Sequence, residues 1–271
     1  MSPARRHRIC LIGWGAISRR VAELLQARAP CGIEVVAVAV RDPSQGRADI
    51  PAAVRLITSP EEIRGLAVDL VVEAAGHEAV KTWGKAALNA GVDLMVSSTG
   101  ALSDNSVFAE LVALAEHNGC RLIIPAGALA AIDGLSAASS LGLDQVEHRI
   151  VKPSGTWRGT SAESLIDLNG LTTPSVFFRG TARDAAARFP QNANASAIVA
   201  MAGIGMDKTV VTLVADPFAT RNAHEIRASG AFGCLEMRIE SVALATNPKS
   251  SEMTALNLVR QIENRMRSLA I

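Results

Sequence analysis

A short apolar run that leads into two closely spaced glycines constrains this chain more than any other stretch. Residues 9–18 read Ile-Cys-Leu-Ile-Gly-Trp-Gly-Ala-Ile-Ser, and apolar residues recur at helical spacing directly afterwards. A strand, a tight glycine turn and a helix in this order form the setting in which a dinucleotide pyrophosphate is bound. Gly13 permits the turn, and Gly15 lets backbone N–H groups approach the phosphates beside the positive end of the helix. Ser18 stands where the pattern usually has a third glycine.

The second half of the pattern follows about 20 residues later. Residues 34–40 are mostly β-branched or small and apolar, which is typical of a strand buried on both faces. Asp42 lies near the position that accepts hydrogen bonds from the adenosine ribose, which favours NAD. Arg41 beside it can pair with a 2′-phosphate, which admits NADP; the alternative is that both are solvated loop residues. The predicted cofactor contacts in this part of the chain are Gly13, Gly15, Ala16, Ile17 and Asp42.

Composition excludes several classes of protein. The chain has 271 residues, 49% of them hydrophobic, and a net charge of +1 without a basic block, which argues against nucleic acid as a partner. No apolar run approaches the roughly 20 residues of a membrane span, and no secretion signal is evident. The four cysteines are scattered and have no metal-binding spacing, which favours a reduced cytoplasmic protein without a metal site: Cys10, Cys31, Cys120 and Cys234.

Strands and helices alternate over the first half of the chain. Four further strands are predicted at 54–57, 69–73, 92–96 and 121–124, with helical patterns at 77–90 and 105–117. This alternation predicts an α/β domain over residues 1–127, with a Rossmann-type doubly wound parallel sheet.

The pattern changes from residue 128 onward. Longer strands are predicted at 145–152, 208–215, 222–229 and 234–240, and helices near 181–189 and 195–203. Turns at Asp216-Pro217 and at 230–233 look tight enough to join antiparallel neighbours. Residues 128–249 are therefore expected to form a catalytic and dimerisation α+β domain, with helices on one face of a mixed or antiparallel sheet. The C-terminal segment 250–269 is expected to form a helix over 252–269, which has an apolar stripe that includes Met266 and Leu269 and should pack back on the first domain.

Hydride transfer to a nicotinamide needs a base, cations for substrate carboxylates and a dry cavity. Among the five histidines, His224 and His77 are the main candidates for the base. Strand alternation puts Asn222, His224 and Ile226 on one face, although a histidine among apolar residues is more often structural. Asn192 and Asn194 are either helix caps or ligands of a carboxamide. The candidate cations, which the sequence does not rank, are Arg149, Lys152, Arg158, Lys208 and Arg221.

Eight segments, in order along nearly the whole chain, make it resemble the L-aspartate dehydrogenase family. They are Gly-Trp-Gly-Ala-Ile at 13–17, Glu-Ala-Ala-Gly-His-Glu-Ala-Val at 73–80, Ser-Ser-Thr-Gly-Ala-Leu at 97–102, Pro-Ala-Gly-Ala at 125–128, Asn-Ala-Asn-Ala at 192–195, Ala-Gly-Ile-Gly at 202–205, Ala-Asp-Pro at 215–217 and Asn-Ala-His-Glu-Ile at 222–226. The departure is Ser18, where the family usually has glycine.

The resemblance implies NAD(P)-dependent oxidative deamination of L-aspartate to iminoaspartate, and then oxaloacetate and ammonia. It implies that His224 is the active-site histidine, that Ala128 and Asn194 contact NAD, that the enzyme is a homodimer, and that iminoaspartate can feed NAD biosynthesis. For the two substrate carboxylates we expect Lys152 together with Ser97 and Thr99. Two alternatives remain: a homoserine-dehydrogenase-like oxidoreductase, which usually calls for a lysine base, and a nucleotide-binding regulatory protein without turnover.

Overall fold

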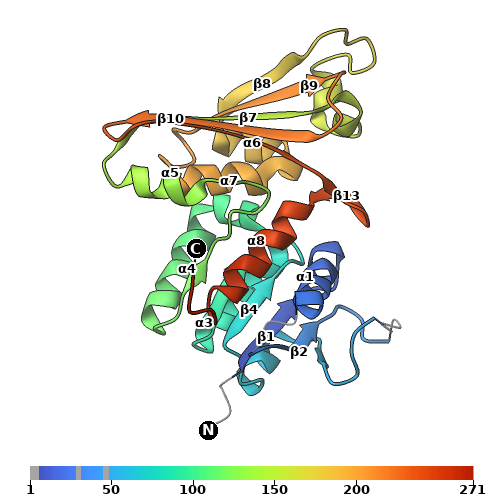
Figure 1. Cartoon of the computed structure of the whole chain (residues 1–271), viewed down its shortest axis with the longest axis vertical. Helices are drawn as coiled ribbons and strands as arrows, with labels where there is room; N and C mark the ends of the chain where they lie inside the picture. Colours follow the sequence, from blue (N-terminus) through green and yellow to red (C-terminus); the bar gives the residue numbers. More distant parts are fainter. Residues whose placement is uncertain (1–5, 29–31, 45–48, 271) are drawn as a thin grey trace. The chain divides into compact units, whose positions relative to one another are not determined.

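The computed structural model describes residues 6–28, 32–44 and 49–270, which form two compact units (Figure 1). The first unit comprises Met1–Pro125 together with Thr254–Ile271, and the second comprises Ala126–Met253. The sequence pattern had put the corresponding boundaries at 127/128 and 249/250. Cys31 lies outside the described residues.

The first unit is built on a parallel sheet. Its strands are β1 (His7–Ile12), β2 (Ile33–Ala39), β3 (Arg55–Ile57), β4 (Leu70–Glu73), β5 (Asp93–Val96) and β6 (Leu122–Ile123). The order across the sheet is β3-β2-β1-β4-β5-β6, and every neighbouring pair is parallel. The order reverses direction beside β1, so the carboxyl ends of β1 and β4 form the switch point at which such sheets bind ligands. The predicted doubly wound α/β fold is confirmed.

Helices from both ends of the chain pack into this unit. They are α1 (Ala16–Arg28), α2 (His77–Ala79), α3 (Lys85–Asn89), α4 (Asn105–His117) and α8 (Glu252–Glu263). Leu258 and Ile262 of α8 share one apolar core with Ile9 of β1 and Val21 of α1. In Figure 1 the red α8 lies beside the blue α1, and Arg28 Nε is 2.8 Å from a carboxylate oxygen of Glu263. The last helix therefore completes the core of the first unit.

Of two helix predictions in this unit, one is confirmed with a change in local geometry and the other was wrong at its end. The helix expected over 77–90 is interrupted by a π-helical turn at Val80–Gly84, where a Cβ on Gly84 would lie 3.0 Å from a Leu94 methyl. The last helix ends at Glu263 rather than at 269, and Met266 and Leu269 are 37% and 71% exposed. These two apolar side chains therefore lie outside the buried core.

The second unit contains a mixed sheet. Its strands are β7 (Leu143–Pro153), β8 (Ser175–Thr181), β9 (Val210–Asp216), β10 (Asn222–Gly230) and β11 (Gly233–Ser241), in the order β11-β10-β7-β9-β8. Only β7 and β9 run parallel to each other among these described strands. A separate hairpin joins β12 (Ala243–Leu244) to β13 (Asn247–Ser251).

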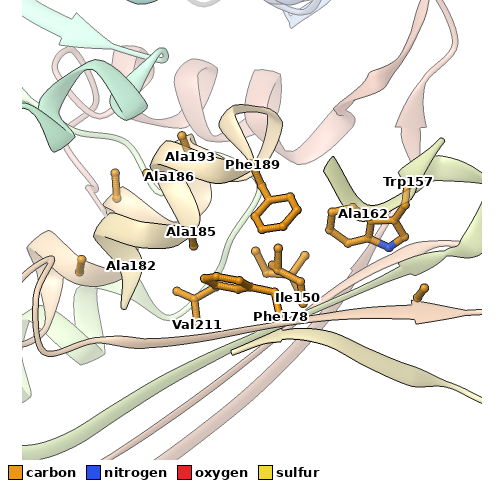
Figure 2. Packing of buried hydrophobic residues seen from close by; sticks show 14 of the residues in the cluster. Ile150, Trp157, Ala162, Phe178, Ala182, Ala185, Ala186, Phe189, Ala193 and Val211 are labelled. Carbon is orange, nitrogen blue, oxygen red and sulfur yellow. The ribbon is translucent and has the colours of Figure 1, made fainter. Parts of the chain in front are cut away.

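One face of this sheet is covered by the helices α5 (Ile132–Ser139), α6 (Ala182–Arg188) and α7 (Ala193–Ala202). Figure 2 shows Phe189, Phe178 and Ile150 meeting in the resulting core, near Trp157. The rings of Phe178 and Phe189 pack edge to face with centroids 5.2 Å apart. Alanines on α6 and α7 belong to this core, and their small side chains let the helices approach the sheet closely.

Two expectations for the second unit were wrong. No strand was predicted at β8, whose Val176 is half exposed and whose pairing with β9 contains a bulge, so its alternation is weak. The Asp216-Pro217 turn does not join antiparallel neighbours, because β7 lies between β9 and β10. A carboxylate oxygen of Asp216 instead accepts hydrogen bonds from the backbone N–H groups of Phe218 and Ala219, at 2.8 and 3.2 Å.

Candidate active site

The glycine turn of the first unit follows β1 and has the geometry that a pyrophosphate requires. Gly13 has φ +89°, and a Cβ at this position would lie 2.8 Å from the Cβ of Ala75. A Cβ on Gly15 would meet nothing within 4 Å, so its backbone faces open space. Helix α1 begins at the next residue, and its first free N–H groups supply the partial positive charge that favours an anion. These residues therefore fit a dinucleotide phosphate.

A groove of about 850 Å³ runs past this turn. Gly13, Gly15, Arg41 and Asp42 all line it, together with His77 at the start of α2. The structure thus brings three of the predicted cofactor residues to one groove. Ala16 and Ile17 form the first turn of α1; they are partly buried and are not among the residues lining the groove.

Asp42 makes a local contact that the sequence did not reveal. Its Oδ1 accepts hydrogen bonds from the backbone N–H and the hydroxyl of Ser44, at 2.9 and 2.7 Å. The carboxylate therefore closes a local turn at the rim of the groove. This contact holds the side chain in place, and it engages one of the two oxygens that a ribose could use.

The buried carboxylate of Glu73 organises the loops at the ends of β4 and β5. Glu73 is completely buried, and its Oε1 accepts hydrogen bonds from the N–H groups of Ala75 and Gly76 and from the hydroxyl of Ser98, at 2.7, 2.8 and 2.9 Å. Its Oε2 accepts from the N–H of Ser98 at 3.0 Å. Ser97 is partly exposed and Thr99 is buried. The sequence analysis did not single out Glu73. The signal that could have identified it is an acidic residue at the end of an otherwise apolar strand.

The second unit places His224 against another histidine. Nδ1 of His224 lies 3.1 Å from Nε2 of His148, and the ring centroids are 5.3 Å apart. His224 on β10 is opposite Ile150 on β7, and His148 is opposite Ile226, so the two rings are diagonal neighbours on the helix-covered face. His224 is 6% exposed and His148 is completely buried. The predicted placement of His224 and Ile226 on one face of the strand is confirmed, and both are buried.

Burial controls the charge of this histidine pair. It lowers the pKa of His148 to about 3. The pKa of His224 is also well below its ordinary value, first because of burial and then because of its neighbours His148 and Lys152. Both rings are therefore neutral at pH 7. A neutral imidazole has one nitrogen that donates and one that accepts, so the pair can share one hydrogen bond.

Lys152 is the candidate cation that lies near His224. It follows His148 and Ile150 at period two on β7, so it shares their face of the sheet. Its ammonium is 5.0 Å from the centroid of the Trp157 ring, and burial lowers its pKa to about 8. The Nε1–H of Trp157 in turn donates to the carbonyl oxygen of Val214 at 3.0 Å, which holds the ring in place.

The other predicted cations have different surroundings. Arg149 pairs with Glu225 on the opposite face of the sheet, Arg158 donates to Asn169, and Lys208 and Arg221 are exposed.

Ala128 and Asn194 both belong to the second unit. Asn194 lies in the first turn of α7 and is exposed, while Asn192, the N-cap residue, is buried and makes no side-chain capping bond. Ala128 is partly buried in the loop that precedes α5, and at Gly127 next to it, with φ +60°, a Cβ would lie 2.9 Å from Ile198.

Within residues 6–28, 32–44 and 49–270, no group of three or more metal-ligating side chains lies close enough to hold an ion. Over the same residues, every helix is too short or too polar to cross a bilayer.

Known proteins match the chain over almost its full length. A family model described as "Aspartate dehydrogenase, C-terminal" matches residues 133–265, and one described as "Homoserine dehydrogenase, NAD binding domain" matches residues 13–125. An L-aspartate dehydrogenase of Brucella anthropi is 54% identical over 97% of this chain and 98% of its own length. One of Cupriavidus taiwanensis is 40% identical over 97% of this chain and 99% of its own length.

Solved structures agree with these relatives. Aspartate dehydrogenase from Thermotoga maritima has a TM-score of 0.79 and 25% identity, and the match covers 98% of this chain and all of that one. A homoserine dehydrogenase from Thiobacillus denitrificans, 14% identical with a TM-score of 0.64 over 96% of this chain and 73% of its own, shares the fold. Relatives of this identity and coverage confirm the resemblance seen in the sequence, and the chain belongs to the L-aspartate dehydrogenase family of NAD(P)-dependent oxidoreductases.

Proposed function

We propose that this chain oxidises L-aspartate to iminoaspartate with NAD(P), and that His224 takes the proton that leaves the substrate. The observation that carries the proposal is a buried, neutral imidazole beside a lysine of lowered pKa in the second unit. The first unit contributes the glycine groove for the cofactor. Iminoaspartate is then hydrolysed to oxaloacetate and ammonia.

His224 has the properties that the proton step requires. The α-ammonium of aspartate must lose a proton before hydride can leave Cα, because a cationic nitrogen has no electron pair to form the C=N bond. A lowered pKa keeps His224 unprotonated, so the acceptor is available throughout the neutral pH range. The bound NAD(P) supplies the hydride acceptor. After oxidation, His224 can direct a water molecule onto the imine carbon.

Lys152 is our choice for one substrate carboxylate, with Ser97 and Thr99 for the other. Among the described residues no ion pair to the Lys152 ammonium is present, and a carboxylate ligand would offset the cost of burying this charge on a largely apolar face. Between Ser97 and Thr99, the N–H and hydroxyl of Ser98 are bonded to Glu73, which holds the 97–99 loop in place.

For the cofactor we propose the following contacts. Gly13, Gly15, Ala16 and Ile17 bind the pyrophosphate through the turn and the start of α1, and Asp42 binds the adenosine ribose. Ala128 and Asn194 of the second unit contact the cofactor in the way that the family resemblance implies.

A second assignment is specifically favoured by the pKa of Lys152, which is about 8. A lysine of this pKa can itself accept a proton, and this is the chemistry of the homoserine-dehydrogenase-like alternative. Arginine at position 152 separates the two roles, because it keeps the positive charge and cannot deprotonate. If Lys152 binds a carboxylate, Lys152→Arg retains much of the activity; if it is the base, Lys152→Arg is as inactive as Lys152→Gln.

The substrate assignment is tested with the purified full chain, NAD or NADP, and absorbance at 340 nm. A site for two carboxylates leaves a cation unpaired when L-alanine binds, which costs roughly 3–5 kcal/mol relative to L-aspartate. L-Glutamate and L-homoserine should also be poor substrates. In reverse, oxaloacetate should be reduced only when ammonia is present. Comparable rates with L-homoserine, or reduction of oxaloacetate without ammonia, contradict the proposal.

The family resemblance also supports a homodimer, a cytoplasmic location and a role in which iminoaspartate feeds NAD biosynthesis. Light scattering should give twice the mass of one chain, and cell fractionation should recover the protein with cytoplasmic markers. Expression in a bacterium that cannot make iminoaspartate should restore growth without added nicotinate. A monomer, a membrane-bound fraction or failure to restore growth contradicts the corresponding proposal.

A further inference from the structure

The interaction of His148 with His224 determines which nitrogen of His224 is available to a substrate. Nδ1 of His224 is 3.1 Å from Nε2 of His148, so this nitrogen is occupied. Only Nε2 of His224 remains to meet a ligand. His148 itself is completely buried and cannot be reached by substrate, so it can act only through His224.

We propose that His148 is a positioning residue, which accepts the Nδ1–H of His224 and thereby presents Nε2 of His224 as the proton acceptor. The proposal rests on the role of His224 given above. It assigns to a neutral histidine the part that a carboxylate plays in many catalytic triads: to orient the imidazole and select its tautomer.

Two arrangements of protons are compatible with the geometry. If Nε2–H of His148 donates, His224 carries its proton on Nε2 and cannot accept another. If Nδ1–H of His224 donates, its Nε2 has a free electron pair. A substrate ammonium donates hydrogen bonds, so its binding at Nε2 selects the second arrangement. When the proton moves, the N–H bond of the ammonium breaks, its electron pair stays on the amine nitrogen, and an Nε2–H bond forms on His224.

The surroundings of Nδ1 of His148 indicate that His224 does not pass the substrate proton on through His148. Nδ1 of His148 is buried and has no hydrogen-bond partner among the described residues. A relay through His148 would therefore end in a buried cation without a counter-ion, which is unfavourable. The proton taken up by His224 must leave again through its own Nε2. A neutral partner also leaves the imidazolium without the charge stabilisation that a carboxylate provides, so His224 releases its proton readily.

Sequence position explains why this pair forms. His148 follows Val146 and precedes Ile150 at period two on β7, so it faces the helices as an apolar residue would. Its place one step diagonal from His224 follows from the register of β7 with β10. Ile226, directly opposite His148 and also buried, provides a matched control position on the same face.

Three single variants and one double variant of the full chain test the proposal. His148→Leu removes the hydrogen bond and should lower kcat by about 10- to 100-fold with little change in the KM for NAD(P). His148→Gln puts an amide near the position of Nε2, so it can accept the same Nδ1–H and should recover most of that loss. Ile226→Val trims the packing beside the pair and should leave kcat nearly unchanged. In a His224→Ala background, His148→Leu should have no further effect, because the two residues act as a unit.

A spectroscopic measurement covers the case in which His148→Leu does not fold. In protein labelled with ¹⁵N-histidine and bound to L-aspartate and NADH, which cannot turn over, His224 should be protonated on Nδ1. Protonation on Nε2 in that complex overturns the proposal. The proposal is also overturned if His148→Leu has a normal kcat while His224→Ala is inactive. In that case the role of His224 as proton acceptor stands, and only the role of His148 is lost. An active His224→Ala enzyme removes both assignments together.

Discussion

The two units of this protein form their candidate functional sites in different ways, the first from backbone and the second from side chains. In the first unit the groove depends on backbone: a glycine at positive φ, a second glycine facing open space and the start of α1. In the second unit the candidate chemistry depends on three side chains on one face of a sheet, His148, Lys152 and His224. A phosphate site made of backbone can be shared by proteins with different reactions, whereas a set of catalytic side chains is particular to one kind of reaction.

The comparisons with known proteins follow the same division. The first unit matches a family model named for the NAD-binding domain of homoserine dehydrogenase, and the model matching residues 133–265, which include most of the second unit and α8, is named for aspartate dehydrogenase. The groove therefore identifies the cofactor class, and the second unit identifies the family. If this division is correct, substitutions in one unit should change cofactor binding and those in the other should change turnover.

The largest expected effect comes from His224. His224→Ala should lower kcat by about 100- to 10,000-fold, because the substrate proton loses its acceptor. Binding of NAD(P), measured by calorimetry, should be nearly unchanged, since the groove of the first unit is untouched. His77→Ala, in the groove, is the control and should cost less turnover. The reverse order of effects would falsify the assignment of the base and the division between the units.

Substitutions of the two glycines in the turn after β1, Gly13 and Gly15, should affect stability and cofactor binding differently. Gly13→Ala puts a Cβ 2.8 Å from Ala75 at a strained φ, so it should lower the free energy of unfolding by about 1–3 kcal/mol and weaken NAD(P) binding. Gly15→Ala adds a Cβ in open space and should leave stability unchanged while it weakens binding at least about tenfold, because the methyl group occupies the approach to the phosphates. Thermal unfolding and cofactor titration measure both. Normal binding by Gly15→Ala would remove that residue from the phosphate site.

The pKa of Lys152 predicts a pH dependence whose sign identifies its role. Because this pKa is lowered to about 8, the ammonium is charged below pH 8 and neutral above it. If the charge binds a carboxylate, kcat/KM for L-aspartate should fall as pH rises through about 8; a base would make it rise. Lys152→Arg stays charged and should abolish the fall. The measurement is kcat/KM for L-aspartate from pH 6 to 10, for the unmodified enzyme and for Lys152→Arg. The ratio of the two profiles removes the titration of the substrate amine, because it affects both enzymes equally.

The smallest expected effect concerns the coenzyme. Asp42→Ala removes the charge that repels a 2′-phosphate, and should shift the ratio of kcat/KM toward NADP by about tenfold. Asp42→Asn is the sharper variant, because its oxygen can still accept the hydrogen bonds of Ser44 while the charge is gone. An equal shift in both variants assigns the effect to charge. If neither shifts the ratio, Asp42 does not bind the ribose.

Much of the first unit could be predicted because its signals are local. The glycine turn lies within ten residues, and parallel strands buried on both faces give apolar runs with helical patterns between them. The errors in the helix predictions arose where tertiary packing, and not the spacing of apolar residues, determined the backbone. Gly84 admits a π-helical turn against Leu94, and the last helix stops at Glu263, although apolar residues continue at helical spacing.

By itself, the sequence determined the fold class, the glycine turn, the shared face of His224 and Ile226 and the family, since each depends on residues close together or on similarity along the whole chain. Tertiary structure alone decided that β7 lies between β9 and β10, and so that His148 meets His224. It also decided that Glu73 binds the loops after two strands, and that burial lowers the pKa of Lys152. Strand pairing and burial join residues dozens of positions apart, and periodicity along one segment contains no information about which other segment will cover it.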